Sequence, residues 1–217
     1  MTLDATWTVF DAVGTVAFAL SGALVGISKR MDVFGISVLA LLTAVGGGIV
    51  RDILIGVTPP AALSDTDNLL LAAATAIFVI GIYSAVRITP KQKKFFTAVF
   101  YLSDTLGLAA FTVTGVIAGL AQDGARFTLP VLLGTLTAVG GGVLRDIMAQ
   151  RMPTVLHADF YAVAAAAGAI LITVMTEKGA DPRSASLVGF ITVAALRLLA
   201  IRFGWQVYHP KPKRRRL

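Results

Sequence analysis

The chain has 217 residues, no cysteine, two histidines and a formal net charge of +7. Charged residues make up 14% of it, against about 25% in soluble domains, and the mean hydropathy is +0.81. These values exclude an ordinary soluble enzyme and a disordered chain, and they indicate a protein embedded mostly in a bilayer. The sequence lacks a phosphate-binding loop, a zinc motif and a catalytic triad pattern, so we expect neither enzyme chemistry, a resident cofactor nor a metal site.

Seven apolar stretches, each long enough to cross about 30 Å of hydrocarbon, follow one another along the chain. We place them near residues 6–27, 34–57, 68–87, 96–120, 127–149, 159–176 and 185–204. Their length and their lack of strict alternation predict helices rather than barrel strands. No basic region precedes the first span, so we expect that span to be retained. The sequence thus predicts an all-α membrane protein with one transmembrane domain over 1–217.

Lysine and arginine are distributed unevenly between the two ends of the spans. Twelve of the 19 lie in alternate connections and in the tail 205–217: Lys29, Arg30, Arg87, Lys91, Lys93, Lys94, Arg151, Lys211, Lys213, Arg214, Arg215 and Arg216. The other connections hold only Arg126, Lys178 and Arg183. This bias places the N-terminus outside and the C-terminus in the cytoplasm, in the inner membrane. We expect the basic tail to lie near anionic lipid rather than to bind nucleic acid, and Arg197 and Arg202 to extend toward the cytoplasmic interface.

The sequence is duplicated. Residues 42–53 (LTAVGGGIVRDI) and 136–147 (LTAVGGGVLRDI) match at ten of 12 positions, at an offset of 94. Upstream, five residues match at an offset of 93: Asp11, Gly14, Phe18, Gly22 and Gly26 with Asp104, Gly107, Phe111, Gly115 and Gly119. Each copy, about 6–87 and about 96–176, holds three spans, so the second enters the membrane from the opposite face. Two inverted repeats and a seventh helix at about 185–204 predict an ion or substrate route at the repeat interface.

Two glycine triplets, Gly46-Gly47-Gly48 and Gly140-Gly141-Gly142, lie near the middle of the second and fifth spans. One glycine in a helix costs about 1 kcal/mol relative to alanine, so three together favour a break or a kink. A broken helix frees backbone groups and presents half-helix ends that attract ions. The alternative is close helix packing, in which glycine only removes bulk.

Charged residues follow each triplet and recur in the first span of each repeat. They are Arg51-Asp52, Arg145-Asp146, Asp11 and Asp104. A charge at the bilayer centre costs roughly 2.5–3.5 kcal/mol, so these groups need partners or water. Neighbours on a helix point about 100° apart, so we expect each arginine to bond a freed carbonyl or an acid on another span. Two interpretations stay open: a static lock between the repeats, or the lining of a pore or gate.

Two phenylalanines and four further glycines complete the candidate set. Phe18 and Phe111 lie two turns after Asp11 and Asp104, where they form either an apolar constriction or ordinary packing. The small-residue pairs Gly22/Gly26 and Gly115/Gly119 predict close helix contacts, within a protomer or between protomers.

Two GGGxxRD motifs in inverted three-span repeats, followed by a seventh span, resemble the prokaryotic branch of the trimeric intracellular cation (TRIC) channel family, which has also been described as a glycine transporter family. The resemblance covers roughly residues 8–204. It implies a homotrimer with one path for potassium and sodium through each protomer, enclosed by the first, second, fourth and fifth spans. It also implies kinks at both glycine triplets and pore or gate roles for the charged residues above. No lysine occurs in 96–120, so the voltage response and phosphoinositide binding of animal members are not expected.

A passive cation channel is therefore the leading hypothesis. A secondary transporter of a small zwitterion such as glycine fits inverted repeats with broken helices equally well on physical grounds. A third hypothesis is a structural or regulatory membrane protein in which the arginines and aspartates only hold the spans together.

Overall fold

The computed structural model describes residues 5–64, 66–86, 90–124, 127–157 and 160–205. The described chain is entirely helical, with seven long helices and two short ones. The long helices are α1 (Ala5–Ser28), α2 (Val33–Leu54), α4 (Asp67–Ala85), α5 (Pro90–Leu120), α6 (Thr128–Met148), α8 (Tyr161–Glu177) and α9 (Pro182–Phe203). They correspond one for one to the seven predicted spans. The short helices α3 (Ala61–Ser64) and α7 (Thr154–His157) follow α2 and α6 and were not predicted.

Six of the long helices in the described chain are long and apolar enough to cross a membrane, and α8 is a shorter apolar helix of 17 residues. Large apolar side chains point outward from them, for example Leu70, Ile77 and Phe78 on α4. An outer surface of this kind is stable in lipid, where apolar side chains need no shielding from water.

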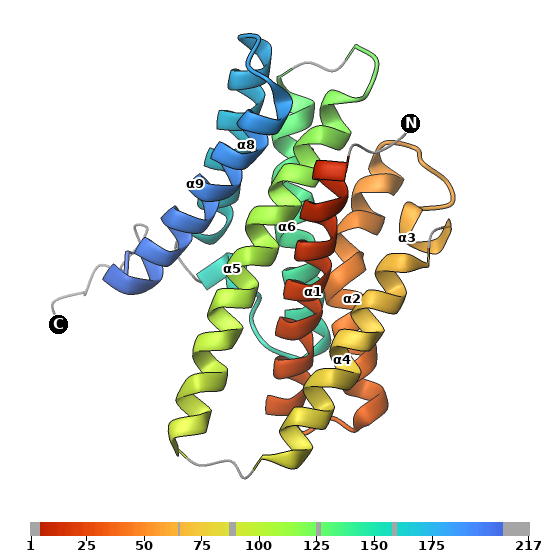
Figure 1. Cartoon of the computed structure of the whole chain (residues 1–217), viewed down its shortest axis with the longest axis vertical. Coiled ribbons are helices and arrows are strands. Elements are labelled where there is room, and N and C mark those ends of the chain that lie inside the picture. Colours follow the sequence, from red (N-terminus) through yellow and green to blue (C-terminus); the bar gives the residue numbers. More distant parts are fainter. Residues whose placement is uncertain (1–4, 65, 87–89, 125–126, 158–159, 206–217) are drawn as a thin grey trace, which may run out of the picture.

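The helices alternate in direction along the long axis of the molecule (Figure 1). α1 descends from the end marked N, whereas α5, its counterpart in the second half of the chain, ascends from the opposite end. α1 packs against α2, α4 and α5, and α6 packs against α2, α5 and α8. α9 lies outside this group and packs on α5 and α8. The four helices that carry the predicted site residues are therefore neighbours.

The small-residue pairs are used inside the protomer. A Cβ on Gly22 would lie 2.8 Å from the Cα of Ala40 on α2, and one on Gly26 would lie 3.1 Å from the Cα of Ile36. The matching pair on α5 faces α6, where Gly115 meets Gly134 and Gly119 meets Pro130. These glycines bring each repeat's first two helices into backbone contact, which settles the choice between internal and intermolecular packing for these motifs.

Both glycine triplets lie inside unbroken helices. α2 runs from Val33 to Leu54 and α6 from Thr128 to Met148, each assigned as one helix across its triplet. The prediction of a break is therefore wrong, because the backbone hydrogen bonds of a helix can be kept when the glycines meet another helix instead of lipid. A bend within a continuous helix stays a prediction.

Candidate functional site

The two triplets meet where α2 and α6 cross. A Cβ on Gly47 would overlap the backbone carbonyl oxygen of Thr137, and one on Gly141 would overlap that of Thr43. Thr43 and Thr137 are equivalent positions in the two copies, so the contact is reciprocal. The Cβ position of Gly140 lies 3.2 Å from the Cα of Gly47. The triplets thus allow two helix backbones to touch at the centre of the molecule, as the packing interpretation proposed.

Two aromatic rings lie against each other close to this crossing. The centroids of Phe18 and Phe111 are 5.2 Å apart, with an interplanar angle of 68°. Each ring fills the space beside a glycine of the facing helix: Phe18 at Gly107 and Phe111 at Gly14. Both side chains are buried, at 0% and 4% exposure. Any route along the interface of α1 and α5 is closed here by apolar side chains.

Arg145 is the centre of a buried ionic cluster in the second half of the chain. Its Nη1 donates to the carboxylate of Asp104 on α5 at 2.6 Å and to Ser21 Oγ on α1 at 2.9 Å. Its Nε donates to the neighbouring Asp146 at 2.8 Å. The side chain of Arg145 is fully buried. A buried charge survives in a low-dielectric interior only with such partners, so these bonds hold α1, α5 and α6 together.

Asp146 joins the end of α6 to the connection that follows it. One carboxylate oxygen accepts from Arg145 and, at 2.6 Å, from Nη2 of Arg151. The other accepts from the backbone N–H and the hydroxyl of Thr154, both at 2.7 Å. The carboxylate is therefore saturated with donors and caps the start of α7. These bonds tie the end of α6 to the start of α7.

The first half of the chain repeats part of this arrangement. Arg51 Nε donates to Asp52 at 2.8 Å, and the second oxygen of Asp52 accepts from the backbone N–H of Ala61 at 2.9 Å. Asp11 differs from Asp104, because it accepts from Nδ2 of Asn68 on α4 at 2.6 Å. The side chain of Arg51 is 15% exposed, whereas that of Arg145 is fully buried.

We expected each arginine to bond a freed carbonyl or an acid on another span, but in both copies it also pairs with the aspartate that follows it. Arg51 binds Asp52 and Arg145 binds Asp146. The three-carbon stem of arginine spans the angular separation of adjacent helix positions, and each aspartate is fixed by the backbone N–H of the short helix that follows. The prediction of an acid on another span is confirmed for Arg145, which binds Asp104.

Two cavities contain the acids Asp11 and Asp104. The Asp11 cavity, of about 50 Å³, is lined by Asp11, Arg51, Asp52 and Asn68, with Phe111 and Gly48 in its wall. The Asp104 cavity, of about 330 Å³, is lined by Asp104, Arg151 and Arg197, together with Phe100, Tyr101, Met152 and Thr154. The first cavity is lined by Arg51 and Asp52 near the end of α2, and the second by Arg151 and Thr154, which follow the end of α6. These two helices end toward opposite ends of the molecule (Figure 1). The sequence motifs therefore assemble two polar chambers separated by apolar and ionic contacts.

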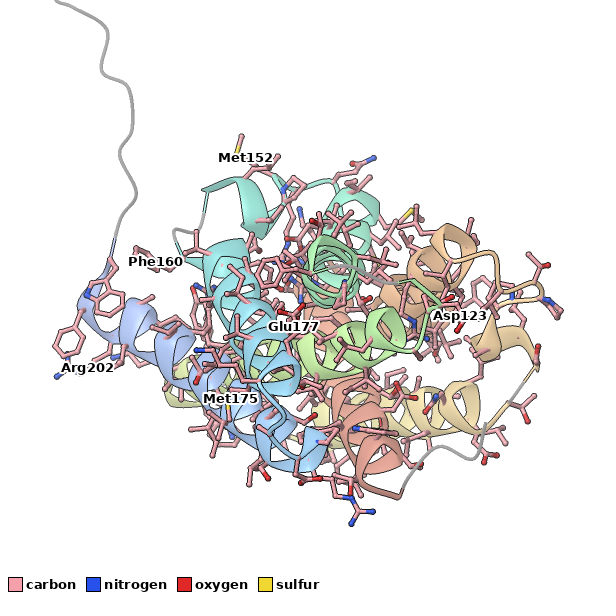
Figure 2. All side chains as sticks on the ribbon, turned by 90° about the horizontal axis from the view of Figure 1, so that it is seen from above. Asp123, Met152, Phe160, Met175, Glu177 and Arg202 are labelled. Carbon is pink, nitrogen blue, oxygen red and sulfur yellow. The ribbon has the colours of Figure 1, made fainter. Side chains whose placement is uncertain are left out.

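Sequence reasoning missed residues in and beside the Asp104 cavity. Arg197 was expected at the interface, but it is 4% exposed and lies 4.8 Å over the ring of Tyr161. Tyr161 places its hydroxyl 3.4 Å from Asp104. Arg202 lies at the periphery beside the end of α9 (Figure 2), and its expected extension toward the cytoplasmic interface stays a prediction. The charge of Arg197 within an apolar span was a signal that this residue could belong to a site. The sequence could not show whether its side chain points into the protein or toward the membrane surface.

Some predicted features lie beyond the described structure. Arg87, Arg126 and residues 206–217, which include most of the basic tail, are outside the described residues. Among the residues that are described, no group of three or more histidine, cysteine, aspartate or glutamate side chains is arranged to hold a metal ion.

The sequence matches a known membrane family. A sequence model of the family described as "Glycine transporter" matches residues 8–84 and 101–177, which correspond to the two copies of the duplication. The chain is 34% identical over 194 residues to the UPF0126 inner membrane protein YadS of Escherichia coli. The aligned region covers 89% of this chain and 90% of YadS.

Solved structures share the fold. The TRIC trimeric intracellular cation channel orthologue from Rhodobacter sphaeroides has a TM-score of 0.84 and 30% identity, covering 93% of this chain and 100% of its own. A second structure, from work on conductance through TRIC cation channels, has a TM-score of 0.81 and 32% identity, over 95% of this chain and 98% of its own.

Proposed function

The chain belongs to the trimeric intracellular cation channel family, and on that premise we propose that it is a passive channel for monovalent cations. The observation that carries the proposal is the presence of one cavity at each of the two acids, with a ring of the Phe18–Phe111 contact in the wall of the Asp11 cavity. Each cavity contains the acid of one repeat, Asp11 or Asp104. Polar chambers that are joined through an apolar constriction can form a gated pore.

The proposed path runs between α1, α2, α5 and α6 of each protomer. A cation enters the Asp11 cavity, passes the rings of Phe18 and Phe111, and leaves past Asp104, or takes the same route in reverse. The two acids lower the energy of a cation beside them, whereas the guanidinium groups of Arg51 and Arg145 are neutralised by Asp52 and Asp146. The path therefore favours potassium and sodium over anions.

The described conformation corresponds to a closed channel in this proposal. The ring contact of Phe18 and Phe111 blocks the path, and the bond of Arg145 to Asp104 occupies the acid that a cation needs. Opening then requires the rings to separate and Arg145 to release Asp104. A shift of α2 against α6 at the glycine crossing, where Gly47 and Gly141 meet backbone carbonyl groups of the facing helix, provides such a movement.

We place the protein in the cytoplasmic membrane as a homotrimer with one path in each protomer. The N-terminus lies outside, and the basic tail 205–217 lies in the cytoplasm beside anionic lipid. The two repeats are related by a pseudo-two-fold axis in the membrane plane, a relation supported by the opposite directions of α1 and α5 in Figure 1. Potassium and sodium are the transported ions, and the proposal includes no resident cofactor, no nucleic acid and no enzyme activity.

Ion flux into liposomes tests this proposal. Vesicles holding the purified protein are expected to exchange potassium and sodium down their gradients much faster than empty vesicles, without a coupled ion. A protein mass of three times the 22.7 kDa chain in detergent tests the trimer. Folded, inserted protein that adds no cation flux would contradict the channel.

Transport of a small zwitterion is the second candidate. The matched family model is described as "Glycine transporter", and the Asp11 cavity presents a guanidinium and carboxylates together, the pair of charges that a zwitterion requires. Counterflow of labelled glycine distinguishes the two functions. Saturable uptake driven by unlabelled glycine inside the vesicles supports the transporter, whereas cation flux without counterflow supports the channel.

A further inference from the structure

The two cavities carry opposite formal charge. The ionisable side chains that line the Asp11 cavity are two carboxylates and one guanidinium, from Asp11, Asp52 and Arg51. Those that line the Asp104 cavity are one carboxylate and two guanidinium groups, from Asp104, Arg151 and Arg197. The buried pair of Arg145 and Asp146 adjoins the second cavity but adds no net charge. One chamber is therefore net negative and the other net positive.

Arg197 supplies one of the two positive charges that line the Asp104 cavity, and Arg151 supplies the other. Arg197 lies on α9, the helix outside the duplication, so the first half of the chain has no equivalent of it. Its side chain is buried, packs over the ring of Tyr161, and its Nε has no hydrogen-bond partner among the described residues. Arg151, the other cation of the chamber, is bound to the carboxylate of Asp146. Arg197 thus adds a positive charge that the described carboxylates of the chamber do not bind directly.

We infer that Arg197 is a conductance-determining residue, a fixed positive charge that makes the unitary cation current differ between the two directions. This inference rests on the proposed channel function and adds an asymmetry to it. A unit charge about 8 Å away in water changes the local concentration of a monovalent cation by about two- to three-fold. Potassium is therefore less concentrated in the Asp104 cavity than in the Asp11 cavity. Current that enters from the Asp104 side is therefore smaller than current that enters from the Asp11 side.

Single-channel recording in symmetrical KCl tests the inference. The measured quantity is the ratio of unitary currents at equal positive and negative voltages, which reports permeation and not opening probability. In low salt, the wild-type ratio is expected to differ from one, and Arg197→Gln is expected to reduce this asymmetry by about two-fold. In about 1 M KCl, where the Debye length is only about 3 Å, the two proteins are expected to give similar ratios.

Two variants separate charge from structure. Arg197→Lys keeps the charge, so it should keep the wild-type ratio even though the contact with Tyr161 changes. Arg202→Gln removes a positive charge from the same helix at the periphery, outside the lining of both cavities, and should also keep the ratio (Figure 2). Equal asymmetry in wild type and Arg197→Gln at low salt would overturn the inference while leaving the channel intact. Absence of any wild-type current would overturn the channel itself, and the inference with it.

Chemical modification repeats the test without altering Arg197. Because the chain contains no cysteine, Met152→Cys offers a single thiol in the lining of the Asp104 cavity. A cationic thiol reagent should increase the asymmetry of the unitary current, and an anionic reagent of similar size should decrease it. Equal changes with both reagents would show a steric effect and contradict the electrostatic account.

Discussion

Asp11 and Asp104 occupy matching positions in the duplicated sequence but have different partners. Asp104 is bound by the fully buried Arg145, and Asp11 accepts from the amide of Asn68. The difference follows from neighbours outside the repeated motif, because Asn68 and Tyr161 begin the helices α4 and α8 with different chemistry. Equal sequence motifs have thus produced unequal sites.

The two acids should therefore contribute differently to stability. Asp104→Asn removes the charge from a buried ion pair, which typically costs about 3–5 kcal/mol. Asp11→Asn weakens a charge-assisted hydrogen bond, which is worth about 1.5–3 kcal/mol. Thermal unfolding in detergent should show the larger drop in transition midpoint for Asp104→Asn. Equal drops would mean that the Arg145 pair contributes no more than the Asn68 contact.

The aromatic contact makes a prediction about permeation. Phe111→Ala removes one of the two rings that separate the cavities and should raise the resting cation flux through liposomes several-fold. A buried phenylalanine truncation also costs about 3–5 kcal/mol, so the folded fraction is measured in the same preparation. Phe78→Ala is the matched control, because Phe78 is exposed on the outer face of α4. Unchanged resting flux in folded Phe111→Ala would contradict the constriction.

At the scale of helices, the crossing of α2 and α6 determines how much space surrounds each glycine of a triplet. Three adjacent glycines in one triplet have different surroundings: Gly47 faces the carbonyl of Thr137, whereas Gly48 has only an arginine side-chain atom at 3.8 Å. The sequence pattern treats these glycines alike, but the structure does not.

Alanine substitution distinguishes them. Gly47→Ala places a methyl group on a backbone carbonyl and should force the helices apart, with loss of thermal stability and of function. Gly48→Ala meets only an ordinary contact and gains about 1 kcal/mol of helix propensity, so it should be neutral or stabilising. Gly81→Ala on α4, with nothing within 4 Å, is a second control. Equal midpoints of thermal unfolding for Gly47→Ala and Gly48→Ala would contradict the close contact of α2 and α6 at Gly47.

The seven spans were predictable because apolar length is a direct consequence of bilayer thickness. The predicted span at 6–27 is helix Ala5–Ser28, and that at 185–204 is Pro182–Phe203. The site was predictable only in part. The motif residues do converge, but the bond of Arg145 to Asp104 and the inward turn of Arg197 depend on side-chain directions that no repeat pattern contains.

At the scale of the whole molecule, the orientation in the membrane can be tested directly because the chain has no cysteine. Ser64 ends α3, Ser84 lies one residue before the end of α4, and both are exposed. Helix α3 lies beside the start of α4, at the opposite end from the last turn of α4 (Figure 1). In intact cells, a membrane-impermeant maleimide should label Ser64→Cys, and it should label Ser84→Cys only after the inner membrane is permeabilised. The reverse pattern would contradict the proposed orientation.

The duplication and the seventh helix act together at this scale. The repeats supply two similar chambers, and α9 adds Arg197 to one of them. The two ends of a pore built from two repeats therefore differ in charge. The role of α9 could not be predicted from the repeat, because this helix lies outside it.

The central claim is that each protomer conducts cations passively. Recording purified protein in a planar bilayer under a KCl gradient tests it most directly. The account predicts discrete unitary currents that reverse near the potassium equilibrium potential. A silent bilayer, with the protein shown to be folded and inserted, or currents that reverse near the chloride potential, would contradict it.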